Sequence, residues 1–218
     1  MASPTVSESR ALKHLTGADP VMAALIGRYE SPAAVRARRG RRPGDAYGAL
    51  VRSIVGQQLS ATAARSIYER LIALFADRTP TPRELLESDP DTLRAVGLSR
   101  AKVAYLRDLA EHIEDGELDL ERLAELPDDE VFAQLVQVKG LGRWSVDMFL
   151  MFHLGRPDVL PVGDLGIRRA VQAEYGLDEL PDVAELGRIA EPWRPHRSLA
   201  CLYLWRSRDS TPVSAGSD

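Results

Sequence analysis

The segment Val138-Lys-Gly-Leu-Gly-Arg-Trp-Ser145 decides the fold, because it places two glycines between two apolar runs of helical spacing, 128–137 and 146–151. This order predicts a helix, a tight glycine hairpin and a second helix. We expect Gly140 and Gly142 to adopt positive φ and to admit another backbone closely. Backbone N–H groups and the helix dipole at the start of the second helix favour a phosphate. The segment therefore indicates DNA-backbone binding, although a Gly-x-Gly is also common as a simple turn between helices.

The rest of the chain has helical spacing almost throughout, which predicts an all-α fold. No segment alternates polar and apolar residues over the length of a useful strand. We expect helices at 7–16, 20–29, 45–55, 61–75, 99–113, 120–125, 128–137, 165–175, 183–191 and 197–206, with further helix starts at Thr81-Pro and Asp89-Pro. The polar ends, 1–6 and 207–218, are expected to be disordered.

The net charge of −4 argues only weakly against a nucleic-acid partner, because the charges are unevenly distributed. Six arginines lie between Arg28 and Arg42, opposed by a single carboxylate, Glu30. This run is either a local basic face for DNA or a solvated flexible loop, and the sequence leaves both open.

The single cysteine, Cys201, excludes an internal disulfide and a four-cysteine zinc or iron–sulfur site. Because Cys201 stands in an apolar segment, we expect a buried thiol. The sequence has no apolar run that could span a bilayer, and its first residues lack the apolar core of a signal peptide. These features predict a cytoplasmic protein without a membrane partner.

Three further segments accompany the hairpin: Ile54-Val-Gly-Gln-Gln-Leu-Ser60, Pro161-Val-Gly-Asp164, and the stretch from Trp193-Arg-Pro-His-Arg-Ser198 to Trp205. In this order they resemble the helix-hairpin-helix DNA glycosylases, and within that superfamily the AlkA-type 3-methyladenine DNA glycosylase II branch. The resemblance extends over residues 45–205.

The resemblance implies a two-lobed, all-α glycosylase fold with its active site in the cleft between the lobes. Residues 1–44 would pack with 165–206 as one lobe. Residues 45–164 would form the other lobe, with the helix-hairpin-helix motif at about 128–154. Bacterial members often carry an additional β-rich N-terminal domain, which we expect to be missing here.

By the same resemblance, Asp164 is the catalytic residue, and it is also a plausible N-cap for the helix that starts at Leu165. A carboxylate near C1′ stabilises the positive charge that develops on the sugar and can orient or deprotonate water. In bifunctional members a lysine follows the hairpin arginine, whereas this chain has Trp144 there. We therefore expect a monofunctional enzyme, with water as nucleophile and Lys139 facing the DNA backbone.

The resemblance places Trp144 and Trp205 in a substrate pocket, with Met148 where related enzymes often have tyrosine. Met151 continues the same helix face. Trp144, Met148 and Met151 could instead be core residues, and for Met151 we favour the core. Trp193 is expected to pack against the C-terminal helix.

A loop residue of the family enters the gap that the flipped nucleotide leaves, and Gln58, or alternatively Gln57, would be this wedge. The two glutamines could equally be a surface pair at a helix end. The expected DNA-backbone contacts are Lys139, Gly140, Gly142 and Arg143. A monovalent cation at the backbone of Val138 and Gly140 is the only cofactor implied, and no organic cofactor is expected.

These expectations describe a monomer that removes alkylated purines from double-stranded DNA in base excision repair, in a bacterial-type cytoplasm and at the nucleoid when bound to DNA. Two alternatives stay open: a non-catalytic helix-hairpin-helix DNA-binding protein, and a glycosylase for oxidised or mismatched bases. The first alternative would need neither Asp164 nor an aromatic pocket. The commonest forms of the second have a hairpin lysine or clustered cysteines, which this chain lacks.

Overall fold

The computed structural model describes residues 6–29 and 45–209, and the regular secondary structure in these ranges is helical, without a β-strand. The predicted all-α class is therefore confirmed. Most of the arginine run and the last nine residues lie outside the described residues. No helix within the described ranges is both long enough and apolar enough to cross a membrane.

The chain folds as two compact units. One unit takes its residues from Met1–Arg41 and Gly155–Asp218, and the other is Arg42–Leu154. We expected the middle unit to extend to 164, so this boundary is earlier than predicted.

Residues 155–164 belong with the C-terminal helix because they are bonded to its first turn. Ser198 lies at the centre of these bonds: its Oγ donates to the carbonyl of Arg156 at 2.7 Å and accepts the N–H of Val159 at 3.0 Å. The Arg197 guanidinium also binds the Asp158 carboxylate, with Nε 2.7 Å from Oδ1.

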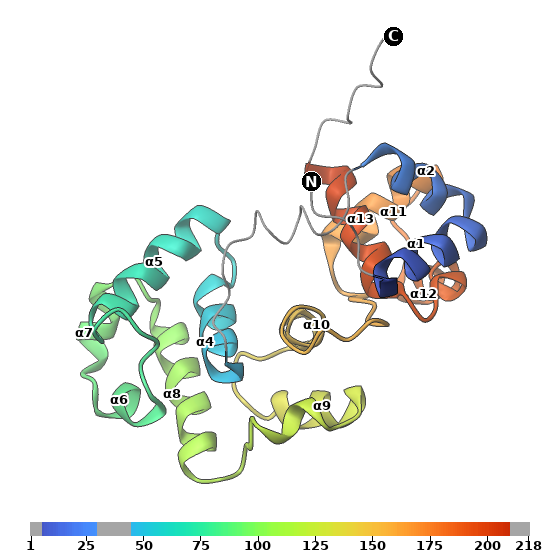
Figure 1. Ribbon diagram of the computed structural model, residues 1–218. Helices are drawn as coiled ribbons and strands as arrows, with labels where there is room; N and C mark the ends of the chain where they lie inside the picture. The colour runs from blue at the N-terminus through green and yellow to red at the C-terminus, as the bar shows by residue number, and fades with distance from the viewer. Residues whose placement is uncertain (1–5, 30–44, 210–218) are drawn as a thin grey trace. The chain divides into compact units, whose positions relative to one another are not determined.

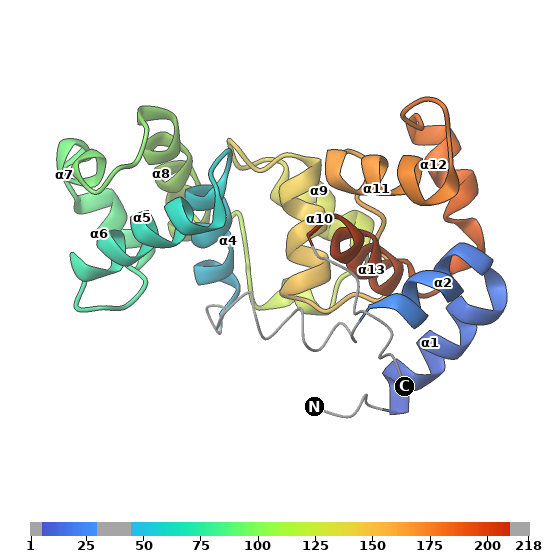
Figure 2. The same ribbon diagram turned by 90° about the horizontal axis from the view of Figure 1, so that it is seen from above.

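Over residues 6–29 and 155–209, the first unit has five α-helices, which Figures 1 and 2 show side by side. They are α1 (Val6–Ala18), α2 (Pro20–Arg28), α11 (Leu165–Tyr175), α12 (Val183–Ile189) and α13 (Arg197–Asp209). The α13 helix packs against α11 and α2 and extends to Asp209, so residues 207–209 are helical where we expected a disordered tail. The rest of the expected tail, 210–218, lies outside the described residues.

A buried carboxylate organises the core of this unit. Asp19 caps α2 through Oδ1, while its Oδ2 accepts the Trp193 indole N–H at 2.9 Å and the Tyr175 hydroxyl at 2.6 Å. Trp193 is fully buried, and its partners are Asp19 and the Tyr175 ring of α11. Its packing against the C-terminal helix stays a prediction. Cys201 is also buried, as expected.

Within its described residues, 45–154, the second unit contains seven α-helices and one short 3₁₀ turn. That turn is Arg122–Ala124, where we had expected a helix over 120–125. The helices are α4 (Ala46–Gly56), α5 (Ala61–Ala73), α6 (Pro82–Glu87), α7 (Pro90–Ala95), α8 (Arg100–Glu114), α9 (Asp128–Leu135) and α10 (Arg143–Phe152). The predicted starts at Thr81-Pro and Asp89-Pro are confirmed, because Thr81 and Asp89 cap α6 and α7.

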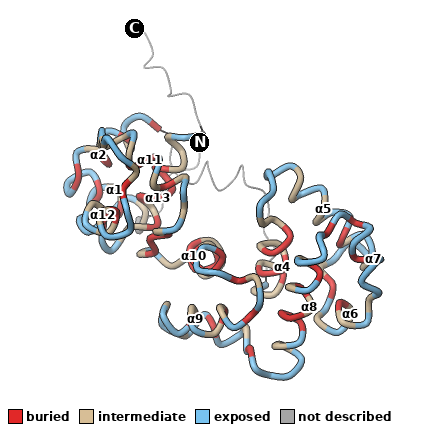
Figure 3. The backbone as a smooth tube through the Cα atoms, turned by 180° about the vertical axis from the view of Figure 1, so that it is seen from behind, coloured by how far each residue is buried: buried red, intermediate tan, exposed pale blue. Residues whose placement is uncertain are grey.

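The core of this unit lies where α8 packs on α4 and α6 and where α10 packs on α4 and α9. Figure 3 shows buried stretches along α4, α8 and α10. Ile54, Leu106 and Val146 are each at most 1% exposed. Burial of one such side chain contributes about 1.5–3 kcal/mol, so these contacts hold α4 and α10 in place beside the hairpin.

Candidate functional site

The segment at 136–142 is a hairpin between α9 and α10, as predicted. Gly140 has φ +85°, and a Cβ on it would overlap the Tyr105 ring, so only glycine fits. Gly142 differs: its φ is −85°, and the expectation of positive φ there is wrong. A Cβ on Gly142 would meet no atom within 4 Å, which leaves room for an outside group to approach.

Gly142 is also the N-cap of α10, and no side chain of the described residues forms a capping hydrogen bond there. The first N–H groups of an uncapped helix and the positive end of its dipole attract anions. The hairpin therefore combines open space with electrostatics that attract an anion, and phosphate binding there stays a prediction.

Lys139 is held by a buried carboxylate that the sequence analysis missed. Asp108, on α8, accepts the Lys139 backbone N–H at 2.8 Å through Oδ2 and the Lys139 ammonium at 2.6 Å through Oδ1. Burial alone would raise the pKa of Asp108, but the two bonds and the charge of Lys139 hold it below its ordinary value. The Lys139 side chain is still 74% exposed, and its contact with DNA stays a prediction.

Arg143 is positioned by its own helix and by α9. Its Nε donates to Asp147 Oδ1 at 3.1 Å, and its guanidinium carbon lies 4.9 Å from the centre of the Phe132 ring. Asp147 is 2% exposed, and burial raises its pKa to about 6. The i,i+4 spacing of Arg143 and Asp147 could have revealed this pair from sequence.

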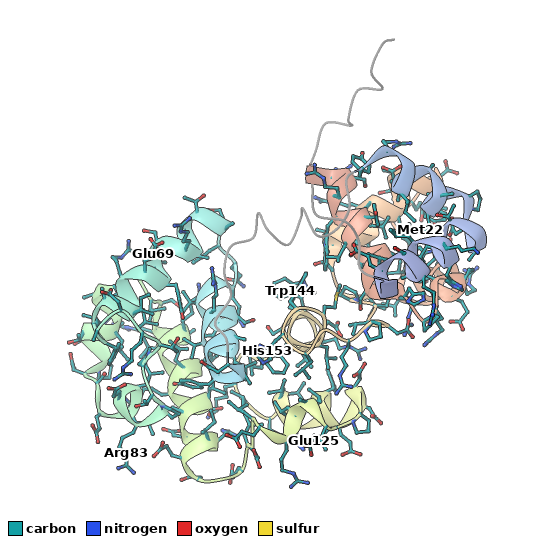
Figure 4. All side chains as sticks on the ribbon, in the orientation of Figure 1. Met22, Glu69, Arg83, Glu125, Trp144 and His153 are labelled. Carbon is teal, nitrogen blue, oxygen red and sulfur yellow. The ribbon has the colours of Figure 1, made fainter. Side chains whose placement is uncertain are left out.

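The expected pocket residues of α10 have different degrees of exposure. Trp144 is 43% exposed, and Figure 4 shows it leaving α10 on the side away from α9. Met148, one turn later, is half-buried, and Met151 is buried as expected of a core residue. An aromatic ring that is this exposed in a well-packed helix can serve as a stacking surface.

The turn between α4 and α5 separates the roles of the two glutamines. Gln57 is half-buried, and its Nε2 donates to the Gly140 carbonyl at 2.7 Å. Gln58 is exposed and adopts φ +57°, which is unusual for a residue with a Cβ. Because the Gln57 amide is hydrogen-bonded to the hairpin, Gln58 is the better candidate for a wedge.

Asp164 lies in the first unit, at the N-terminus of α11. Its Oδ1 accepts the Ile167 N–H at 2.8 Å, which confirms the predicted N-cap. The same oxygen accepts the Trp205 indole N–H at 3.0 Å. Trp205 comes from α13, so the packing of α13 on α11 brings the two residues together.

Gly166 explains how this arrangement fits, and the sequence analysis missed it. A Cβ on Gly166 would lie 2.9 Å from Asp164 Oδ1 and 3.4 Å from the Trp205 ring. A glycine in the first turn of a helix is unfavourable by propensity alone, and this cost was the available signal.

Within the described residues, no cluster of three or more His, Cys, Asp or Glu side chains could hold a metal ion. The chemistry available at α11 is thus that of one fixed carboxylate beside an indole. In the other unit, the hairpin ends at the uncapped N-terminus of α10, which favours anions.

The family model described as "HhH-GPD superfamily base excision DNA repair protein" matches residues 51–195. The chain belongs to this superfamily. The match covers the hairpin, the α4–α5 turn and Asp164.

Relatives in this family are named as glycosylases. The DNA-3-methyladenine glycosylase 1 of Schizosaccharomyces pombe is 33% identical over 206 residues, which cover 92% of this chain and 88% of that protein. The putative DNA-3-methyladenine glycosylase YfjP of Bacillus subtilis is 32% identical over 74% of this chain, which spans only 58% of YfjP.

The solved structure of the S. pombe 3-methyladenine DNA glycosylase Mag1 in complex with abasic DNA has the same fold. Its TM-score is 0.80 at 30% identity, and the match covers 92% of this chain and 97% of Mag1. This likeness confirms the predicted helix-hairpin-helix glycosylase fold.

Proposed function

We propose that this protein is a monofunctional DNA glycosylase of base excision repair, which hydrolyses the N-glycosidic bond of alkylated purines flipped out of duplex DNA. The observation that carries the proposal is the Asp164 carboxylate, whose Oδ1 is fixed by the Trp205 indole and the Ile167 N–H. The names of its relatives agree with this activity.

A fixed carboxylate suits this reaction because positive charge builds on the sugar as the C1′–N bond breaks. Asp164 would stabilise that charge and orient the water whose oxygen bonds to C1′. The water proton passes to the carboxylate or to solvent, and the bonding electrons leave with the base. A cationic alkylated purine departs as a neutral base, so no general acid is needed.

The substrate class follows from the exposed aromatic ring. Trp144 offers a π-face of the kind on which a flipped, positively charged base stacks. Relatives named for 3-methyladenine support the same class. We include 7-methylguanine and related lesions in this substrate class because they also carry a positive charge.

Water as nucleophile is supported by the state of Lys139. A Schiff base requires a neutral amine, but hydrogen bonding to Asp108 raises the pKa of the Lys139 ammonium. Trp144, which follows the hairpin arginine, supplies no amine. The abasic strand should therefore remain intact.

Duplex DNA is the expected partner, and the complex of Mag1 with abasic DNA supports this expectation. The hairpin would hold a phosphate, and Gln58 would fill the gap beside the opposite base. A phosphate contact carries no sequence information, so damage would be recognised through flipping and the pocket.

The monovalent cation expected at the hairpin would use the carbonyls of Val138 and Gly140. The Val138 oxygen already accepts the Leu141 N–H at 3.1 Å, and the Gly140 oxygen accepts Gln57 Nε2. Each carbonyl keeps a second lone pair, so the two groups fit a cation only through that lone pair. A bound cation would add positive charge beside the phosphate.

A base-release assay on duplexes that each carry one lesion tests the proposal. We expect release of 3-methyladenine, 7-methylguanine or 1-methyladenine, which carry the positive charge, and the neutral ethenoadenine serves as a comparison. Asp164→Asn should lower the single-turnover rate by at least about a hundredfold while lesion binding is nearly retained, because charge is lost and shape is kept. Release of oxidised or mismatched bases alone would indicate the other glycosylase class. DNA binding without release of any base would indicate a non-catalytic module.

A further inference from the structure

Three consecutive residues of the α4–α5 turn face in different directions. Gln57 turns inward and is half-buried, whereas Gln58 is exposed and Leu59 is 38% exposed. The left-handed backbone at Gln58, φ +57°, produces this reversal. Such a conformation is unfavourable in a residue with a Cβ, and it persists only where neighbouring contacts hold it.

The contact that holds this turn is the side-chain amide of Gln57. Nε2 donates to the Gly140 carbonyl at 2.7 Å and lies 3.4 Å from Ser145 Oγ. Gly140 is the hairpin residue with positive φ, and Ser145 is a buried residue in the first turn of α10. The short bond to Gly140 joins the α4–α5 turn to the hairpin, and the longer contact with Ser145 is secondary.

A second bond fixes the end of α4 from the other side. The Lys102 ammonium, on α8, donates to the Val55 carbonyl at 2.8 Å, and burial lowers the pKa of Lys102. A cation on the last carbonyls of a helix also stabilises its dipole. The α4 helix therefore ends at a defined place, and the direction of the following turn depends on Gln57.

We propose that Gln57 is a positioning residue that sets the wedge Gln58 in register with the phosphate-binding hairpin. The proposal rests on the proposed function of the same site. The bound phosphate and the gap left by one extruded base lie at a fixed separation along the DNA strand. The hairpin and Gln58 must therefore be held at that same separation. An error of about 1 Å in such a placement can cost a large part of the rate, and the Gln57 amide sets this separation.

The test uses two substitutions that remove the side-chain N–H donor. Gln57→Met keeps the volume, and Gln57→Glu keeps the shape but turns a carboxylate oxygen toward the Gly140 carbonyl. Single-turnover excision is measured for 7-methylguanine paired with cytosine and mispaired with thymine. Both variants should slow the paired substrate by about tenfold, the worth of one well-placed hydrogen bond, and the mispaired substrate much less, because flipping there is easier.

A double-mutant cycle separates positioning from general support. If Gln57 acts through Gln58, adding Gln57→Met to Gln58→Ala should produce little further loss on the paired substrate. Ser145→Ala, which removes only the 3.4 Å contact, should leave the ratio of paired to mispaired rates near the wild-type value. Full additivity, or equal slowing of both substrates by Gln57→Met, would overturn the proposal.

A spectroscopic readout keeps this inference distinct from the proposed chemistry. With 2-aminopurine next to the lesion, its fluorescence reports unstacking even when no base is released. Gln57→Met should reduce this signal on the paired duplex, while affinity for undamaged duplex stays within about threefold, since phosphate contacts dominate that affinity. If the wild-type protein gives the fluorescence signal but releases no base, the proposed hydrolysis is refuted. The role of Gln57 is then still tested by comparing the signal of Gln57→Met with that of the wild type. An unchanged signal in Gln57→Met would refute the positioning role alone.

Discussion

The indole N–H of Trp205 donates to Oδ1 of Asp164 at 3.0 Å, and the same oxygen accepts the Ile167 N–H at 2.8 Å. The tryptophan expected in a stacking role is therefore also bonded to the carboxylate on which the chemistry depends. Two donors on one oxygen fix the rotation of the carboxyl group. Orientation of Asp164 and the predicted stacking on a flipped base would consequently be two separable roles of Trp205.

Trp205→Phe separates these two roles, because it keeps an aromatic face and removes the donor. We expect lesion binding near the wild-type level and a single-turnover rate lowered by about tenfold, as for loss of one hydrogen bond to a charged group. Trp205→Ala should impair both binding and rate. A wild-type rate in Trp205→Phe would show that the indole bond has no part in orienting the carboxylate.

Gly166→Ala should damage the site without unfolding the protein. The new methyl group would lie 2.9 Å from Asp164 Oδ1, so the carboxylate or the indole must move. Helix propensity favours alanine by up to about 1 kcal/mol, which opposes the cost of the clash. We expect a rate at least about tenfold lower, since misplacement by an ångström has effects of this order.

The matched control is Gly187→Ala in α12, where a Cβ meets no atom within 4 Å. This variant should keep the wild-type rate, and urea unfolding should show no loss of stability. If both alanine variants are fully active, the site tolerates a Cβ at position 166, and Gly166 is no constraint on catalysis.

Substitutions of the two hairpin glycines should have different effects, one on stability and the other on DNA binding. Gly140→Ala would place a Cβ against Tyr105 at positive φ, and should lower the free energy of unfolding by about 1–2 kcal/mol or more. Gly142→Val should leave folding intact, because the space there is open, and should weaken binding to every duplex alike. Salt titrations of duplex affinity alongside urea unfolding distinguish these outcomes. Wild-type affinity in a folded Gly142→Val would mark the hairpin as a structural turn.

The sequence predicted those features that depend on local order. Helix spacing predicted the helices, and the span expected for α11, 165–175, matches the structure. The N-cap at Asp164 and the hairpin were also predictable, because each lies within a few residues of its cause. The φ of Gly142 was mispredicted, because a Gly-x-Gly does not say which glycine adopts the left-handed conformation.

Contacts between distant segments could not be predicted in this way. Asp108 binds Lys139 across 31 positions, and Gln57 binds Gly140 across 83. Neither spacing has a periodic signature, because the packing of whole helices sets these distances. The bond from Trp205 to Asp164 could not be predicted either, because it depends on the packing of α13 on α11, although both residues had been placed at the site.

Borohydride trapping tests the nucleophile. Trp144 has no amine, and Lys139 is held as an ammonium by Asp108, so we expect no covalent protein–DNA adduct and an intact abasic strand. A trapped adduct would contradict this, and its loss in Lys139→Gln would identify that lysine. Persistence of the adduct in Lys139→Gln would direct the search to another amine.

Asp147 should make stability depend on pH in the opposite sense to most carboxylates. Burial raises its pKa from 3.8 to about 6, and within the described part of the chain its Oδ2 is buried without a hydrogen-bond partner. The folded state therefore holds the proton more tightly than the unfolded state. The stability from this group is fully present below pH 3.8, is lost as the pH rises through about 6, and stays low above that.

Asp147→Asn removes this titration while it keeps an oxygen that can accept from Arg143. Relative to the wild type, the free energy of unfolding of the variant should rise by about 1–3 kcal/mol as the pH goes from about 4 to about 7. A shift of two pKa units sets the upper end of this range. Urea unfolding of both proteins across this range measures the difference. Asp108→Asn is the control, because the pKa of Asp108 is lowered and its stabilisation is lost on acidification instead. A difference between Asp147→Asn and wild type that does not change with pH would show that Asp147 is already ionised without penalty, with its charge balanced by Arg143.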